Sequence, residues 1–141
     1  MAVILNIADA VVAQLNAGSL SQPITAERHY QPKFELPDMT ALHVTVVPRG
    51  ITTKSLDRSR DAFDYQIDVA IQRKAEVTNA VLDVLMNLVE EIADHFRTQP
   101  LMSFPQARCV EVKNAPVFSQ EHLEEFRQFT SVLTLTFRLA R

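Results

Sequence analysis

Two charged segments of this chain have side chains at a spacing that could bind a metal ion. In EEIADHF, Glu91 and His95 lie four residues apart, so a helix would place a carboxylate and an imidazole on one face. The same spacing is typical of the solvated side of an amphipathic helix. QEHLEEF allows the same two interpretations, and for both segments we favour the solvated surface. The residues concerned are Glu90, Glu91, Asp94, His95, Glu121, His122, Glu124 and Glu125.

Cys109 is the single cysteine, and as a nucleophile it would need a base such as His29 or His43. Its place in the alternating segment RCVEVKN favours a small buried hydrophobic residue instead. One cysteine also excludes an internal disulfide and suits a reducing compartment, so we expect synthesis in the cytoplasm.

Asp61, Asp64 and Asp68 gather near the start of the segment DAFDYQIDVAIQRK. Asp64 and Asp68 share one face of a strand, but a general acid–base pair would also need a pocket. A hydrated sheet face is the interpretation that we favour, with these acids paired to arginines across the strands. The possible partners are Arg28, Arg73 and Arg138.

The glycine content, the net charge and the lengths of the apolar runs exclude several classes of function. Gly18 and Gly50 are the only glycines, and neither opens a phosphate-binding loop. A net charge of −3 argues against a protein that binds nucleic acid by neutralising phosphates. No apolar run approaches the roughly 18 residues of a membrane span, and the apolar N-terminus lacks the basic region of a signal peptide. We therefore predict no enzymatic activity, cofactor or metal, no specific nucleic-acid binding and no membrane association.

Hydrophobic periodicity predicts seven main elements along the chain. Helices are expected over 3–17, with Gly18 as a left-handed C-terminal cap, and over 78–97, with Thr78 as the N-cap. Strands are expected at 26–36, as an interrupted edge strand, at 42–48, at about 62–74, at 108–114 and at 129–141. Arg49–Arg60 is expected to be a long loop, and SQEHLEEFRQ either a helical turn or a hairpin tip.

This order predicts one α+β domain over residues 1–141, with the arrangement α-β-β-β-α-β-β. Its strands would form a single, mostly antiparallel sheet with two helices packed on one face. The other face would carry threonine, glutamine and charged residues. Such a face either meets water or serves as a docking surface for another protein.

Three blocks of sequence resemble the small tail-terminator and tail-completion proteins of long-tailed bacteriophages. They are AERHYQPKFELPDMTALHVTVVPRG, DAFDYQIDVAIQRK and LEEFRQFTSVLTLTFRLAR, and the order of elements is similar over essentially the whole chain. The resemblance implies a virion protein, assembled in the host bacterial cytoplasm, that closes the tail tube as a ring of about six copies. Its partners would be further copies of itself, the tail tube protein and the head–tail connector. The same fold serves neck-completion and tube proteins, and a small cytosolic ligand-binding domain is a further alternative.

Within this interpretation two groups of charged residues have expected positions. The 49–60 loop would reach toward the adjacent tube ring or the connector, where mixed charges would set register. The polar sheet face would line the lumen or a subunit boundary, and its two acids would disfavour adhesion to DNA. The first group is Arg49, Lys54, Arg58 and Arg60; the second is Asp64, Asp68, Arg138 and Arg141.

Overall fold

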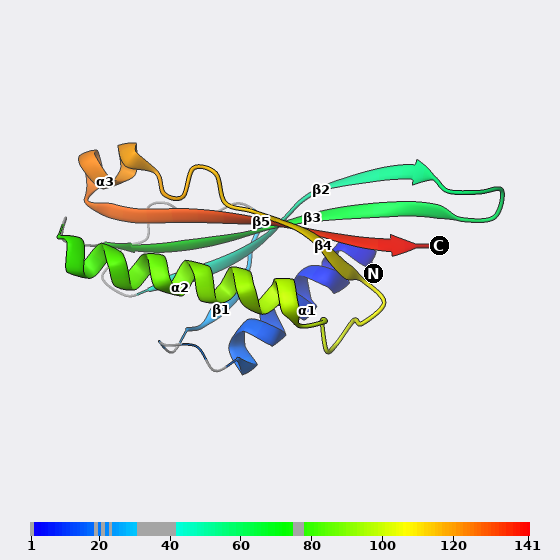
Figure 1. Ribbon diagram of the computed structural model, residues 1–141, viewed down its shortest axis with the longest axis horizontal. Coiled ribbons are helices and arrows are strands. Elements are labelled where there is room, and N and C mark those ends of the chain that lie inside the picture. The colour runs from blue at the N-terminus through cyan, green and yellow to red at the C-terminus, as the bar shows by residue number, and fades with distance from the viewer. Residues whose placement is uncertain (1, 19, 21, 23, 31–41, 75–77) are drawn as a thin grey trace.

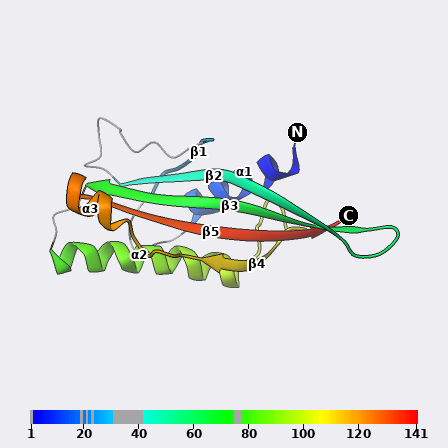
Figure 2. The same ribbon diagram turned by 90° about the horizontal axis from the view of Figure 1, so that it is seen from above.

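The computed structural model describes residues 2–18, 20, 22, 24–30, 42–74 and 78–141. A five-stranded sheet in the order β1-β2-β3-β5-β4 forms its centre. Helices α1 (Val3–Ala17) and α2 (Asn79–Thr98) lie on one face of this sheet (Figures 1 and 2). The strands are β1 (Ala26–Arg28), β2 (His43–Ser55), β3 (Asp61–Lys74), β4 (Arg108–Lys113) and β5 (Gln128–Ala140).

The predicted α+β class and the order of the main elements are confirmed, and the sheet is mixed. β1 runs parallel to β2, whereas the pairs β2–β3, β3–β5 and β4–β5 are antiparallel. β1 lies at one edge, as predicted for the 26–36 segment, but covers only three residues. Residues 31–36 of that prediction lie outside the described residues.

The core lies between the sheet and the two long helices, and the helix-facing side chains of the strands form one side of it. Every second side chain of β3 from Tyr65 to Ile71 is fully buried against the helices. In α1 and α2 the buried side chains recur at three- and four-residue intervals, so each helix contributes one apolar stripe. The largest buried side chains are Tyr65, Phe96, Phe129, Phe137, Ile7, Ile67, Ile71, Leu85, Leu88, Ile92, Leu101 and Leu133.

One of the two predicted helix caps is confirmed and the other is wrong. Thr78 caps α2, and its hydroxyl accepts a hydrogen bond from the backbone N–H of Val81. Gly18 was predicted to be left-handed, but its φ of −76° and ψ of 151° are extended. The site is tight, because a Cβ on Gly18 would lie 3.3 Å from the carbonyl oxygen of Gln14.

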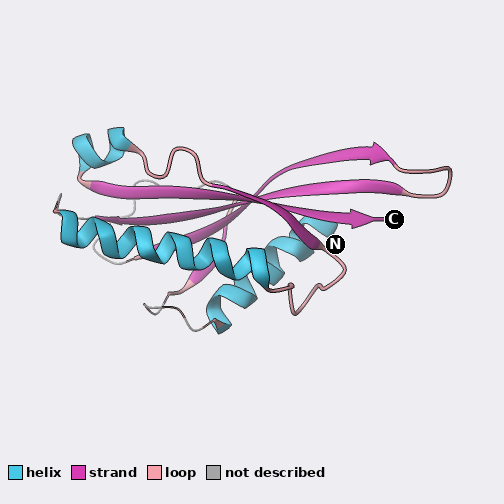
Figure 3. Ribbon diagram, viewed as in Figure 1, coloured by secondary structure: helices cyan, strands magenta, loops and turns pink. Residues whose placement is uncertain are grey.

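The predicted loop over Arg49–Arg60 is wrong, because most of it is strand. β2 continues to Ser55 and β3 begins at Asp61, so only residues 56–60 connect them. Pro48 does not end the strand. Among the described residues, β1 pairs with β2 only as far as Val46, so β2 is an edge strand beyond that point. An edge strand tolerates proline, which has no backbone N–H to donate to a neighbour. The far part of this hairpin, residues 51–63, projects beyond the helices and is called the arm here (Figures 1 and 3).

The segment SQEHLEEFRQ contains a third helix, α3 (Gln120–Phe126), rather than a hairpin tip. Ser119 caps its start, where its hydroxyl accepts from the backbone N–H of His122. α3 lies where β5 begins, on the side of the sheet away from α2 (Figure 1). The face opposite the two long helices is therefore covered at one end, in contrast to the bare face that the sequence predicts.

Candidate interaction surface

The sheet face opposite α1 and α2, called the open face here, carries ion pairs between neighbouring strands. Asp64 of β3 and Arg138 of β5 are direct cross-strand neighbours. Arg138 donates to both carboxylate oxygens of Asp64, from Nε at 2.8 Å and from Nη2 at 3.1 Å. The hydrogen bond from Arg138 is the main cause that lowers the pKa of Asp64. Arg138 is one of the three partners expected from the sequence.

Asp68 has a comparable arrangement four residues further along β3. The hydroxyl of Thr134 on β5 donates to Asp68 Oδ1 at 2.8 Å. Arg49 Nη1 of β2 donates to Thr134 Oγ1 at 3.1 Å and lies 3.6 Å from Asp68 Oδ1. Three neighbouring strands are thereby linked through one polar row. Arg49, expected in a projecting loop, belongs to this row on the sheet.

The ion pairs change the electrostatic character that the sequence predicts for the open face. Asp64 and Asp68 are each balanced by an arginine, so neither presents an isolated negative charge. Cross-strand register places further charged residues on the same face, because opposed residues in antiparallel strands share a side. They are Lys54 of β2 and Arg108, Glu111 and Lys113 of β4. The surface is mixed in sign.

We expect Asp64→Asn to lower the free energy of unfolding by less than about 1 kcal/mol at pH 7, because Arg138 is half exposed and solvent screens the pair. The pKa of Asp64 is lower in the folded than in the unfolded state, so its carboxylate stabilises the fold at pH values above the unfolded pKa of about 3.9. This contribution is lost as the pH falls through the lower pKa of the folded state. The difference between variant and wild type should therefore disappear in acid. Urea unfolding at pH 7 and below pH 4 measures it; a difference that grows in acid would contradict the assignment.

The end of the open face away from the arm is closed by α3. His122 of α3 and Gln128 both bond to the hydroxyl of Thr130, each at 3.0 Å. Thr130 and its cross-strand neighbour Gln72 are buried there. The open face is consequently available to a partner only toward the arm.

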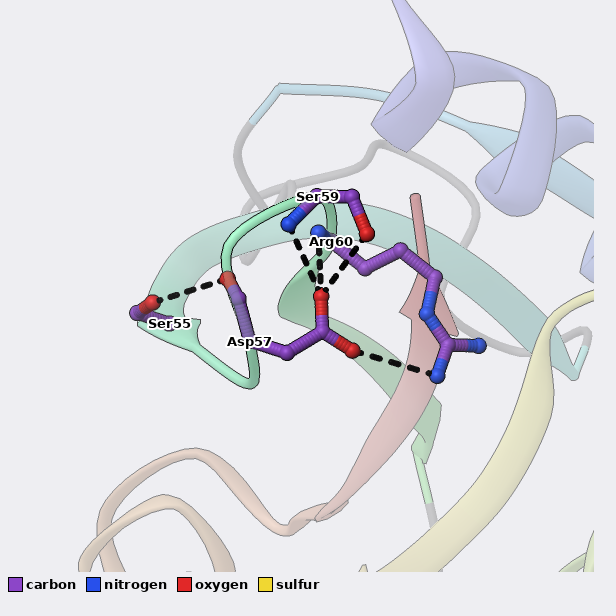
Figure 4. Close-up of polar contacts among 4 residues, drawn as sticks. All are labelled: Ser55, Asp57, Ser59 and Arg60. Atoms are coloured by element: carbon purple, nitrogen blue, oxygen red, sulfur yellow. Dashed lines mark hydrogen bonds and ion pairs between the residues drawn. The ribbon is translucent and has the colours of Figure 1, made fainter.

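The tip of the arm has a defined shape because one carboxylate organises it (Figure 4). Asp57 Oδ1 accepts from Ser59 N at 2.9 Å, Ser59 Oγ at 3.0 Å and Arg60 N at 2.9 Å. Asp57 Oδ2 accepts from Arg60 Nη2 at 3.4 Å. The hydrogen bonds from Ser59 are the main cause that lowers the pKa of Asp57. Backbone bonds from Leu56 and Asp57 to the Arg60 carbonyl close the turn. Such a turn is an Asx-type turn, which orders a short connection without glycine.

Arg141 is separated from the other three residues with which the sequence groups it. Its guanidinium carbon lies 4.4 Å from the centroid of the Phe63 ring, and Nη2 donates to the Tyr65 hydroxyl at 3.4 Å. Phe63 and Tyr65 point to the helix side of the sheet, whereas Asp64, Asp68 and Arg138 point to the open face. Arg138 and Arg141 are an odd number of residues apart, and alternation puts them on opposite sides.

The structure does not assemble the chemical groupings that the sequence raises. β3 and β5 lie between Cys109 on β4 and the two histidines near β1 and β2. Burial raises the pKa of the Cys109 thiol, which disfavours the reactive thiolate. On α2, Asp94 pairs with Arg97 at 3.0 Å. Among the described residues, no three potential metal ligands gather closely enough to hold an ion.

Sequence reasoning missed a polar connection between α1 and the segment that follows α2. Gln14 of α1 is 8% exposed. Its Oε1 accepts from Met102 N at 2.9 Å, and its Nε2 donates to the Pro100 carbonyl at 3.0 Å. Nε2 also lies 3.0 Å from His95 Nε2, which must then accept and hold its proton on Nδ1. In the sequence Gln14 is visible only as a polar residue on an otherwise apolar helix face.

A groove of about 570 Å³ adjoins this connection. The C-terminal ends of α1 and α2 form its walls, and most of its lining is apolar. Six of the residues that line it are Ala13, Gln14, Ala17, His95, Pro100 and Met102. Among the described residues, none of the helices combines the length and apolar content that a membrane span requires.

The comparisons with known proteins find similar chains among solved structures. No protein-family model matches the chain. No curated protein matches it either. Among solved structures, the chain is similar to the sheath/tube terminator in the cryo-EM structure of an extracellular contractile injection system, PVC, in the extended state. The TM-score is 0.43 and the sequence identity is 15%. The match covers 100% of this chain and 57% of that chain, so the present chain spans little more than half its length.

Proposed function

We propose that the protein is a structural component of a phage-type tail that closes the end of the tail tube as a homo-oligomeric ring. The ring ends tube polymerisation and offers a surface to the head–tail connector. The observation that carries this proposal is the projecting arm with its ordered tip, which extends beyond the packed body and is free to meet another protein. The open face, closed at one end and polar toward the arm, supports the same function.

The proposal places the protein in the tail or neck of a virion, after assembly in the bacterial cytoplasm. A ring of about six copies follows from the family that its sequence resembles. DNA would pass through the ring without specific binding, since the open face balances its charges. A neck-completion or tube protein of the same fold would use the arm and the open face in the same manner.

Imaging and sizing of the purified protein test this function. Negative-stain micrographs and light scattering should show rings in solution, or density that caps the ends of tail tubes mixed with the protein. Tubes grown in its presence should stop at a defined length. A strict monomer that neither binds tube ends nor restores a tail-defective phage would overturn the proposal.

A ligand-binding domain is the second candidate, and the groove beside Gln14 is the observation that favours it. Its volume lies in the usual range for small-molecule sites. Replacing Ala13 by Phe would fill the groove without touching the arm. Binding of a small molecule by the wild type that this variant loses, with no tube capping by either protein, would favour a function centred on the groove.

A further inference from the structure

The arm exposes apolar side chains that the body of its own chain does not cover. Ile51 is 54% exposed and Leu56 is 55% exposed, and every residue from 51 to 60 is exposed. Large apolar groups on a projecting element are a common feature of surfaces that bind another protein. Because the Asp57 turn already orders the tip, docking the arm would cost little further conformational entropy.

Basic side chains flank Leu56 along the chain, and Lys54 lies on the opposite side of the hairpin from Ile51. Lys54, Arg58 and Arg60 are all exposed within seven residues of one another. Asp57, one of the two acids within residues 51–63, is engaged in the turn that it organises. The arm therefore presents an apolar centre with a positive rim, and its partner should present an exposed apolar residue among acids.

The outer surface of α2 has this complementary character. Val84 is 49% exposed, which is unusual for an aliphatic residue on a helix whose other face packs against the sheet. Asp83 precedes it, and three further acids continue along the same helix, which has a single arginine. Those three acids are Glu90, which is exposed, Glu91, which is half-buried, and Asp94, which pairs with Arg97.

The arm projects beyond the end of α2 and away from its outer surface (Figures 1 and 2). A contact between the two surfaces must therefore join two copies of the chain. We propose that the arm of one copy docks on the outer surface of α2 of the next, with Leu56 against Val84 and the basic rim against the acids. This inference rests on the proposed ring. Because the two surfaces differ, the contact is head to tail, the type that generates closed rings when the rotation between copies permits.

Charge reversal with rescue tests the contact. We expect Lys54→Glu/Arg58→Glu and Asp83→Lys/Glu90→Lys each to weaken assembly at least about tenfold, because like charges then face one another. A chain with all four substitutions should regain assembly, since each reversed arm meets a reversed helix. Arg73→Glu/Arg127→Glu, at the end of the sheet away from the arm, is the matched control: it changes the net charge as much as the arm variant and should assemble normally. Sedimentation velocity, in solution and on tube ends, measures assembly; circular dichroism verifies the fold.

Three outcomes would overturn the inference. Normal assembly of the arm variant, no recovery in the four-substitution chain, or a wild-type protein that is monomeric both in solution and on tube ends would each do so. If the arm variant forms rings but no longer caps tubes, the arm meets the tube; the inference then fails and the proposed function stands. If reversal and rescue succeed but no variant binds tubes, the contact between copies stands and the proposed function fails.

Discussion

Leu133→Ala should lower the free energy of unfolding by about 2–5 kcal/mol, the largest effect that we expect from a single substitution among those considered. Leu133 is fully buried in β5, beside its cross-strand neighbour Val69 and beneath the long helices. Truncation removes apolar contacts and leaves a cavity that the strands cannot close, since β5 is held by β3 on one side and β4 on the other. Chemical denaturation with an unchanged m-value measures the loss.

Met102→Ala provides the matched control for Leu133→Ala. Both changes shorten a large apolar side chain, but Met102 is 86% exposed and its truncation should alter stability by less than about 0.5 kcal/mol. Similar losses in the two variants would contradict the position of Leu133 in the core.

Gln14→Ala should lower the free energy of unfolding by about 1–3 kcal/mol. The substitution leaves the Met102 N–H and the Pro100 carbonyl without the side chain that bonds to both. A hydrogen bond contributes about 0.5–1.5 kcal/mol net, and the substitution removes two of them from the segment that follows α2. Hydrogen exchange should report the loss locally, as faster exchange of the Met102 amide.

Gln99→Ala is the control for the Gln14 prediction, because it removes an exposed glutamine side chain from the same region. It should leave both the stability and the Met102 amide unchanged within about 0.5 kcal/mol. Unaltered exchange at Met102 in Gln14→Ala would show that the amide is protected by burial rather than by Gln14.

Local patterns in the sequence were enough to predict both long helices, the strand segments and the α+β class. Val81, Leu85, Leu88 and Ile92 recur at helical spacing, and that spacing alone identifies the face of α2 that packs. The alternation from Phe63 to Ile71 likewise identifies the buried side of β3. Such patterns involve only residues within one or two helical turns or a few strand positions. They can therefore be recognised in the sequence before it is known which elements pack against one another.

The arm shows where a local pattern misleads. Residues 49–60 are polar and mixed in charge, which is typical of a loop, and Pro48 suggests that the strand ends. Pairing with β3 overrides both signals. In β2, Ile51, Thr52 and Thr53 lie opposite Tyr65, Asp64 and Phe63 of β3. The other side of β3 is hydrogen-bonded to β5, which holds β3 in place. A polar strand is stable there because its neighbour supplies the hydrogen bonds, and the sequence of the segment itself does not record that neighbour.

What the sequence by itself determined is the two long helices, the strands outside the arm, the buried face of these elements and the residue types available to the surface. The tertiary structure alone decided which charges meet, because those contacts join residues far apart in the chain. Asp64 and Arg138 are 74 positions apart and Gln14 and Met102 are 88 apart, and strand order, register and helix packing bring each pair together. Side-chain periodicity is a local property, whereas a salt bridge or an interaction surface depends on every element that folds between its parts.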